Sequence, residues 1–321
     1  MDTKTKVQNT STKNDKVIAD LPVACADEKA AVEFMEKQRW GDHPACPHCG
    51  DLDVYQMKDS KTGARQANFR WRCHGCKDQF TVKVGTVLED SRIPLRHWCY
   101  GFWRASTSKK GVSALEIKRQ TGLSYKSALF MLQRIRFAME DTPSGKLHGD
   151  VEVDEVYIGG RPRYKGVSKR GRGTSKTPVL AMVERSGGHV RTQVLPNITG
   201  KTLRKAVMEQ VDQASRIHTD ELGGYVGIGK YFDGGHVTVR HAAGEYAKGD
   251  ITTNRVESFF AIVRRGIDGI YHSVSKEHLH RYLAEFSFRY SNRDLADGQR
   301  TQLAIKMAQG KRLMYRTPIG K

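Results

Sequence analysis

The spacing of apolar residues divides the chain into a mainly helical first part and a strand-rich second part. Residues 27–40 place Ala31, Phe34 and Met35 on one side of a short amphipathic helix. Residues 94–139 continue with apolar positions at helical spacing, and the Pro/Gly-containing stretch 142–149 interrupts them. We therefore expect a domain boundary just before residue 147.

After this boundary the pattern changes to β-branched runs. Strands are predicted at 151–159, 178–185, 188–196, 215–220 and 237–240, with a glycine turn at 186–188 that makes the second and third a hairpin. Helices are predicted at 201–214, 254–267 and 276–292. Mixed strands followed by helices indicate an α/β domain of about 150 residues.

Composition adds a partner class to this outline. The 321 residues include 54 Lys and Arg against 35 Asp and Glu, a formal net charge of +19. Such an excess favours a polyanion, because a basic surface releases the counterions condensed on nucleic acid. An anionic membrane surface is the competing partner, but no segment has the pattern of a basic amphipathic anchor. No apolar stretch approaches the roughly 20 residues of a spanning helix, and the polar N-terminus lacks a signal-peptide core. We therefore expect a cytoplasmic protein.

Two segments at the ends are predicted to be tails. Residues 1–20 are polar and are expected to be disordered, and residues 296–321 form a basic C-terminal tail. Between them we expect an N-terminal helix with a small cysteine-containing module at 21–90, a helical segment at 91–141 and the α/β domain at 147–295.

Four of the six cysteines form two close pairs, which predicts a structural zinc ion. Each pair has the spacing C-x2-C, and two such knuckles complete a tetrahedral site. Gly50 and Gly75 are expected to supply the unusual backbone angles of the two turns. The alternative is a redox pair or coincidence. The zinc ligands are expected to be Cys46, Cys49, Cys73 and Cys76.

Residues 112–139 have the pattern of a helix-turn-helix. One helix ends near Gln120, TGLS forms a glycine turn, and a second helix starts at Ser124 with one apolar, buried face. The remaining residues of the second helix are left for solvent or a major groove, and we expect DNA contacts from Tyr125, Lys126 and Arg134. An ordinary helical hairpin is the alternative, and Lys118 occupies a position where such motifs prefer a small residue.

Residues 161–176 form a second basic segment. The stretch has seven Lys or Arg, three glycines and no acid, so it reads as a loop that could lie along phosphates. The DNA-contacting candidates in it are Arg163, Lys169, Arg170 and Arg172. The alternative is a solvated run of charge.

Acidic residues gather where a basic protein would be expected to avoid them. The stretch VEVDEVYIGG carries Asp154 inside a predicted strand, and IHTDELGGY carries Asp220 at the end of another. The helix at 254–267 places its large apolar residues on one face and Asn254, Glu257 and Arg264 together on the other. Acids from two strands and a helix are the ligands that a two-metal site requires, and cations between them would relieve their repulsion.

A resemblance narrows this chemistry. CPHCG, CHGCKDQF, VEVDEVYIGG, HTDELGGY and the long block from Asn254 to Arg293 resemble bacterial insertion-sequence transposases that carry an N-terminal zinc ribbon and a DDE integrase core, relatives of eukaryotic Merlin elements. The resemblance implies a multidomain protein in which the α/β domain is ribonuclease H-like. It implies Asp154 and Asp220 as the first two catalytic acids, with Mg²⁺ or Mn²⁺ as the cofactor, in two ions.

The third acid has two candidates. Glu257 matches the family's acid and Arg264 stands where these enzymes often carry a basic residue, whereas some members use an asparagine, which Asn254 would match. We prefer Glu257, because a carboxylate binds a hard cation more strongly than an amide oxygen does. Other candidates for supporting roles are His218 and His241, and Glu152 and Glu155 are weaker candidate ligands than Asp154.

The sequence therefore predicts a transposase. It would bind the terminal inverted repeats of its element, cleave the ends and join the 3′-hydroxyls to target DNA, working as an oligomer on paired ends. The alternative is a zinc-ribbon DNA-binding regulator whose transposase-like domain has lost its chemistry.

Overall fold

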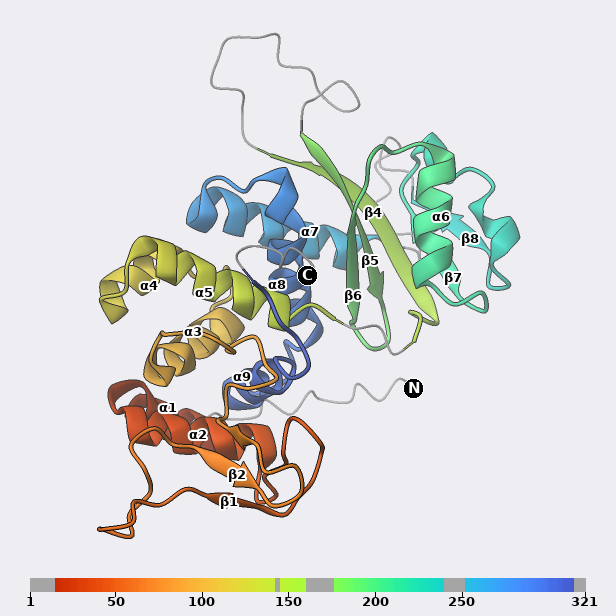
Figure 1. The fold of residues 1–321 in the computed structure, drawn as a ribbon. Helices are drawn as coiled ribbons and strands as arrows, with labels where there is room; N and C mark the ends of the chain where they lie inside the picture. The colour runs from red at the N-terminus through yellow and green to blue at the C-terminus, as the bar shows by residue number, and fades with distance from the viewer. Residues whose placement is uncertain (1–14, 142–144, 160–175, 240–251, 315–321) are drawn as a thin grey trace, which may run out of the picture. The chain divides into compact units, whose positions relative to one another are not determined.

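The computed structural model describes residues 15–141, 145–159, 176–239 and 252–314, which belong to two compact units (Figure 1). One unit, called unit 1 here, consists of Met1–Ser108, Val112–Met139 and Asp294–Lys321. The other, unit 2, consists of Lys109–Gly111 and Glu140–Arg293. The chain thus enters unit 2 and returns to unit 1 for its last segment.

Helices are the main regular elements in the described part of unit 1. Their bounds are α1 (Lys16–Ala26), α2 (Glu28–Trp40), α3 (Leu95–Thr107), α4 (Ala114–Thr121), α5 (Tyr125–Ala138) and α9 (Asp297–Lys306). The amphipathic helix predicted at 27–40 is confirmed as α2, whose Ala31, Phe34 and Met35 are buried. The two helices predicted around the TGLS turn are present as α4 and α5, and Gly122 takes the left-handed conformation between them.

Helices occupy parts of both predicted terminal tails: α1 begins within the stretch 1–20 that was predicted to be disordered, and α9 lies in the stretch 296–321. Helix α1 begins at Lys16 because Asp15 accepts hydrogen bonds from the amides of Val17 and Ile18, and a carboxylate at this position satisfies amides that have no partner within the helix. Helix α9 lies inside the predicted basic tail. It is anchored by the buried Thr301, whose hydroxyl is 2.9 Å from that of Ser106 on α3. The cap of α1 is local, whereas the contact that anchors α9 comes from a segment 195 residues away.

A small antiparallel sheet follows α2 in unit 1. Strands β1 (Val54–Gln56), β2 (Trp71–Cys73) and β3 (Gln79–Phe80) pair in the order β1-β2-β3. Trp71 and Phe80 form its buried core together with Cys46 and Cys73, and the ring of Trp40 from α2 meets both aromatic rings edge-on. The sheet is therefore attached to its neighbouring helix through aromatic packing.

Unit 2 is built on a five-stranded mixed sheet in the order β6-β5-β4-β7-β8. Its strands are β4 (Asp150–Ile158), β5 (Thr177–Glu184), β6 (Val190–Val194), β7 (Arg216–Thr219) and β8 (His236–Thr238). β4 pairs antiparallel with β5 and parallel with β7, so the longest strand lies at the centre. The hairpin predicted at 186–188 is confirmed, and Gly188 supplies its positive φ of 67°.

Alternate residues of β4 face two different hydrophobic cores. Val151 and Val153 pack with α6 (Gly200–Gln210), whereas Val156 and Ile158 pack with α7 (Asn254–Gly266) and α8 (Leu279–Ser291). Helix α6 thus covers one face of the sheet and α7 with α8 the other, as Figure 1 shows. Because side chains alternate along a strand, Glu152 and Asp154 share the face that is covered by α7.

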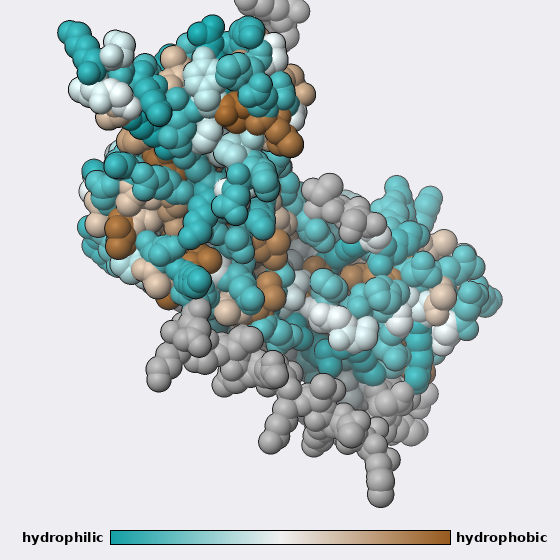
Figure 2. Space-filling model, turned by 90° about the horizontal axis from the view of Figure 1, so that it is seen from below, coloured by the Kyte–Doolittle hydropathy of each residue, from teal (hydrophilic) through white to brown (hydrophobic). Residues whose placement is uncertain are grey.

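Hydrophobic residues are dispersed over the surface seen in Figure 2, which is largely hydrophilic with small brown patches. Across the described ranges, no helix combines the length and the apolar content that a membrane crossing requires. This finding agrees with the hydropathy of the sequence.

Helix α3 begins without a capping side chain of its own. Its N-cap residue is Pro94, and Glu28 on α2 accepts the amides of Leu95 and Arg96 over 2.7 and 3.1 Å instead. We expect Glu28→Ala to lower the free energy of unfolding by about 1–2 kcal/mol, the usual cost of a lost cap. Urea unfolding followed by circular dichroism measures it, with the exposed Glu33→Ala on the same helix as the control. Equal stability of the two variants would contradict the capping role.

Candidate active site and metal centre

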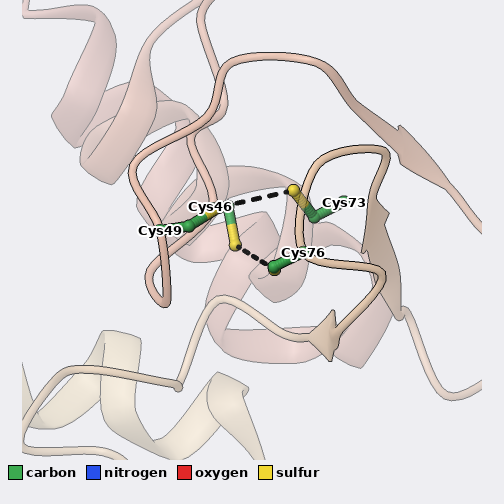
Figure 3. Close-up of side chains that lie close together, drawn as sticks. All are labelled: Cys46, Cys49, Cys73 and Cys76. Atoms are coloured by element: carbon green, nitrogen blue, oxygen red, sulfur yellow. Dashed lines mark hydrogen bonds between the residues drawn. The ribbon is translucent and has the colours of Figure 1, made fainter.

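The four paired cysteines lie at one point of unit 1. The sulfur atoms of Cys46 and Cys76 are 3.6 Å apart, as are those of Cys49 and Cys73, and all four lie within 4.8 Å of one another (Figure 3). Zinc–sulfur bonds of about 2.3 Å in a tetrahedron place sulfur atoms about 3.8 Å apart. The arrangement therefore fits a zinc ion held by four thiolates, with no coordination position left for chemistry.

The two knuckles are alike, although not in the way that the sequence predicts. A residue with positive φ directly follows the second cysteine of each pair: Gly50 at 80° and Lys77 at 66°. The expectation for Gly50 is confirmed, whereas the one for Gly75 is wrong, because Gly75 has no positive φ. A Cβ there would lie 2.4 Å from a carboxylate oxygen of Asp51, so a larger residue would require the Asp51 side chain to move.

Asp154 and Asp220 come from neighbouring strands of unit 2. In the parallel pairing of β4 with β7, Glu152 lies opposite His218. Extending this register by two residues places Asp154 beside Asp220, directly after the last residue of β7, and paired residues of parallel strands point to the same face. Asp220 turns the chain there, because its carboxylate accepts the amide of Leu222 over 3.0 Å. The sheet therefore brings the first two candidate acids together.

The third candidate acid lies in the first turn of α7. Glu257 is exposed, and its carboxylate accepts the hydroxyl of Thr253 over 2.6 Å. The predicted division of the helix is observed, since the apolar face is buried whereas Asn254, Glu257 and Arg264 are exposed. Arg264 lies seven residues beyond Glu257, about 10 Å along the helix axis.

The pKa of Asp154 depends on the charges of the other two candidate acids, Asp220 and Glu257. The pKa of Asp154 is raised from 3.8 to about 7, first by burial and then by the negative charges of Glu155, Asp220 and Glu257, while the backbone amide of Glu155 lowers it. Burial and like charges both disfavour the ionised carboxylate. A cation among these groups would remove that penalty.

Asp154, Asp220 and Glu257 offer carboxylate oxygens as potential metal ligands. Hard cations such as Mg²⁺ prefer carboxylate oxygens, so the donor chemistry fits such an ion. Within the described residues, the four cysteines form a group that could hold a metal ion as placed, and the three acids do not form such a group. The acids are therefore close enough to shift the pKa of Asp154 without being drawn into a tight cluster.

Two further acids on β4 have other partners. Glu152 is fully buried, and one of its oxygens accepts the amides of Arg255 and Val256 at the start of α7 over 2.8 and 3.1 Å. Its other oxygen accepts Arg185 over 2.9 Å. Glu155, on the opposite face, accepts the hydroxyl of Tyr225 over 2.7 Å. The expectation that Glu152 could serve as a metal ligand is therefore wrong, because hydrogen-bond donors occupy both of its carboxylate oxygens.

The two histidine candidates differ in outcome. His218 is buried on β7, and its Nε2 lies 2.6 Å from Asp150, which is four residues before Asp154. Burial lowers the pKa of His218 more than that carboxylate raises it. His218 thus belongs to a pair at the start of β4 and not to the acids. His241 lies outside the described residues.

The residues predicted to contact DNA differ in their exposure. Tyr125 is 47% exposed at the start of α5, and Lys126 beside it is exposed. Arg134 was predicted to remain free for DNA, and this is wrong: it is 7% exposed and donates to the carbonyl of Glu89 over 2.9 Å. The later part of α5 packs on more than one side, which a single apolar stripe does not reveal. Arg163, Lys169, Arg170 and Arg172 lie outside the described residues.

Comparison with known proteins places both modules. Residues 26–79 match the family described as the transposase zinc-ribbon domain, and residues 146–291 match the ISXO2-like transposase domain. The chain is 29% identical over 277 residues to an uncharacterized protein in transposable element ISH50 of Halobacterium salinarum, covering 82% of this chain and 90% of the relative. The catalytic core domain of BIV integrase is similar at 15% identity, over 43% of this chain and 82% of that one, with a TM-score of 0.29.

We expect the purified protein to contain one zinc ion per chain, because the four sulfur atoms already have the spacing of a tetrahedral site. Cys73→Ser should lose most of this zinc and unfold the small sheet. Elemental analysis and circular dichroism measure both effects, with Cys25→Ser, outside the cluster, as the control. A Cys73→Ser protein that retains its full zinc content would show that the assignment is wrong.

The raised pKa of Asp154 predicts a pH-dependent stability. In metal-free protein the folded state keeps a proton on Asp154 up to about pH 7, whereas the unfolded chain releases it near pH 3.8. The contribution of this proton is complete below the lower value and is lost as pH rises towards 7, by an amount on the order of a few kcal/mol.

Urea unfolding should therefore show that wild-type stability falls from pH 4 to pH 8, whereas the stability of Asp154→Asn does not. Mg²⁺ should make the fall in the wild type smaller. The control is Asp233→Asn, an exposed aspartate of the same unit. Identical pH profiles for wild type and Asp154→Asn would contradict the raised pKa.

Proposed function

We propose that this chain, which belongs to the insertion-sequence transposases that carry an N-terminal zinc ribbon, cleaves the ends of its element and transfers their 3′-hydroxyls to target DNA. The observation that carries this proposal is the register of β4 and β7, which sets Asp154 beside Asp220, with Glu257 near enough to raise the pKa of Asp154. The central β4, antiparallel to one neighbour and parallel to the other, supports a ribonuclease H-like architecture.

The roles of the site residues follow from their chemistry. Asp154, Asp220 and Glu257 would hold Mg²⁺ or Mn²⁺, in two ions, and these ions would supply activation of the attacking oxygen and stabilisation of charge on the reacting phosphate. Thr253 orients Glu257 through its hydrogen bond. Arg264, exposed on the same side of α7, would contact a phosphate of the bound DNA.

The third ligand is Glu257 in this proposal and Asn254 in the alternative. The pKa of Asp154 is raised first by burial and by nearer acids, and the charge of Glu257 adds to this effect, which supports Glu257. A carboxylate also contributes negative charge to a cation, which an amide does not.

DNA recognition is proposed for the exposed start of α5 in unit 1. Tyr125 and Lys126 lie there, directly after the turn that follows α4. In helix-turn-helix proteins the first residues of the second helix contact base edges. The net charge of +19 supports binding to the phosphate backbone, and the joining of two ends supports an oligomer.

We expect Asp154→Asn and Asp220→Asn each to reduce Mg²⁺-dependent cleavage of the element's own ends by more than the roughly 100-fold that changes outside the ligand set cost. Both variants should still bind the ends, because the residues proposed for DNA recognition, Tyr125 and Lys126, lie in unit 1 and are unchanged. Gel-based cleavage and strand-transfer assays with a mobility-shift assay measure the two properties, and Asp233→Asn is the control.

Glu257→Gln and Asn254→Ala decide the third ligand in the same assay. If Glu257 is the ligand, the cleavage activity of Glu257→Gln should be as low as that of the aspartate variants, whereas Asn254→Ala should retain much more activity. Strand transfer at the wild-type rate by Asp154→Asn would overturn the proposal. A wild-type chain that binds ends without cleaving them would favour the DNA-binding regulator.

A further inference from the structure

The start of α7 is tied to the strand that carries Asp154. Arg255 and Val256 lie between the two candidate third ligands, Asn254 and Glu257, and their amides donate to the same oxygen of Glu152. The N-cap residue Thr253 forms no capping hydrogen bond of its own, because its hydroxyl donates to Glu257. The helix therefore takes its cap from β4.

We propose that Glu152 is a positioning residue of the active site: it fixes the separation between Asp154 and the ligand on α7, and so sets how tightly the site holds its divalent cation. This inference rests on the proposed function, in which these residues form the cation site. It holds for either third ligand, because the two amides lie between them.

The link between the acids is short. Glu152 and Asp154 are two residues apart on one face of β4, about 7 Å along the strand. Val256, whose amide Glu152 accepts, directly precedes Glu257. A shift of the helix start relative to the strand would therefore move Glu257 relative to Asp154 by a similar distance, and hydrogen-bonded partners outside a ligand set commonly change metal affinity or activity by 10- to 100-fold.

The surroundings of the Glu152 side chain favour a hydrogen-bond acceptor at both of its terminal atoms. Its Oε1 accepts Arg185 over 2.9 Å and the hydroxyl of Thr252 over 3.3 Å, and Arg185 in turn donates to the carbonyl of Thr252 over 2.6 Å. The side chain is fully buried, and all these partners are donors. A glutamine would have the same size but would direct an amide N–H₂ at a donor, so Glu152→Gln disturbs the link without creating a cavity.

The test compares Glu152→Gln with Glu184→Gln in the full-length chain. Glu184 is a second buried glutamate of the same sheet, 2% exposed, and it accepts the amide of Gly187 and the hydroxyl of Ser186 in the β5–β6 turn. Four properties are measured below the melting temperature of both variants: strand-transfer kcat, KM for the DNA end, Mn²⁺ affinity by calorimetry, and hydrogen exchange of the peptide around residues 253–258.

For Glu152→Gln we expect kcat and Mn²⁺ affinity each to fall by about 10- to 100-fold, with KM for the end unchanged. Exchange around residues 253–258 should increase, and raised Mn²⁺ should restore part of the activity of Glu152→Gln but none of the activity of Asp154→Asn. Glu184→Gln should match the wild type in kcat, Mn²⁺ affinity and exchange of this peptide, whatever its stability.

Wild-type kcat and Mn²⁺ affinity in Glu152→Gln would overturn the proposal, and so would an equal loss in Glu184→Gln, which would make the effect a general one of stability. If the wild-type chain transfers no strands, the proposed function fails, and Mn²⁺ affinity together with exchange then decides the role of Glu152. Faster exchange with unchanged Mn²⁺ affinity would limit Glu152 to capping and reject the positioning role.

Discussion

The hydrogen bonds from the amides of Arg255 and Val256 to the buried Glu152 are the constraint on which unit 2 depends. They join its central strand to the helix that covers the same face of the sheet. The helix dipole and the two amides stabilise the negative charge of Glu152, and Arg185 supplies a full positive charge to the other oxygen. A buried carboxylate is tolerated here because every oxygen has donors, and removing them would leave a costly unpaired charge.

Two helices of unit 1 are also capped by a carboxylate from a segment distant in sequence. Helix α3 starts at Pro94 and takes its cap from Glu28, and the second residue of α9, Gly298, donates to Asp15 over 2.8 Å. In each case the residue at the helix start makes no side-chain cap, and the carboxylate comes from a segment at least 67 residues away. Such a cap forms only when the tertiary structure forms, so it specifies the packing of two elements as well as the start of a helix.

This explains how far the sequence predicts the fold. Local signals were sufficient for the cysteine pairs, the hairpin at 186–188 and the two faces of α7, because each depends on residues within a few positions of one another. The contacts by which distant carboxylates cap α3, α7 and α9 were not predicted. Arg134 was assigned to DNA because one apolar stripe cannot reveal that a helix is packed on several sides. Helix α1 was missed although its cap by Asp15 is local, because the polar composition of residues 1–20 favoured disorder.

The candidate site shows the same division between local and distant information. Asp154 and Asp220 were named as candidate acids through the family resemblance of the motifs around them, but the role proposed for Glu152 has no local signal. In the sequence it is one more acid beside Asp154, and its alternation on the strand correctly puts both on one face. Its partners lie 103 and 104 residues further along the chain. Two acids of one short stretch thus differ in their surroundings: hydrogen-bond donors occupy both oxygens of Glu152, whereas burial and like charges raise the pKa of Asp154. Glu152 is satisfied by its donors, whereas the like charges around Asp154 are unbalanced, and a cation at the proposed site would balance them.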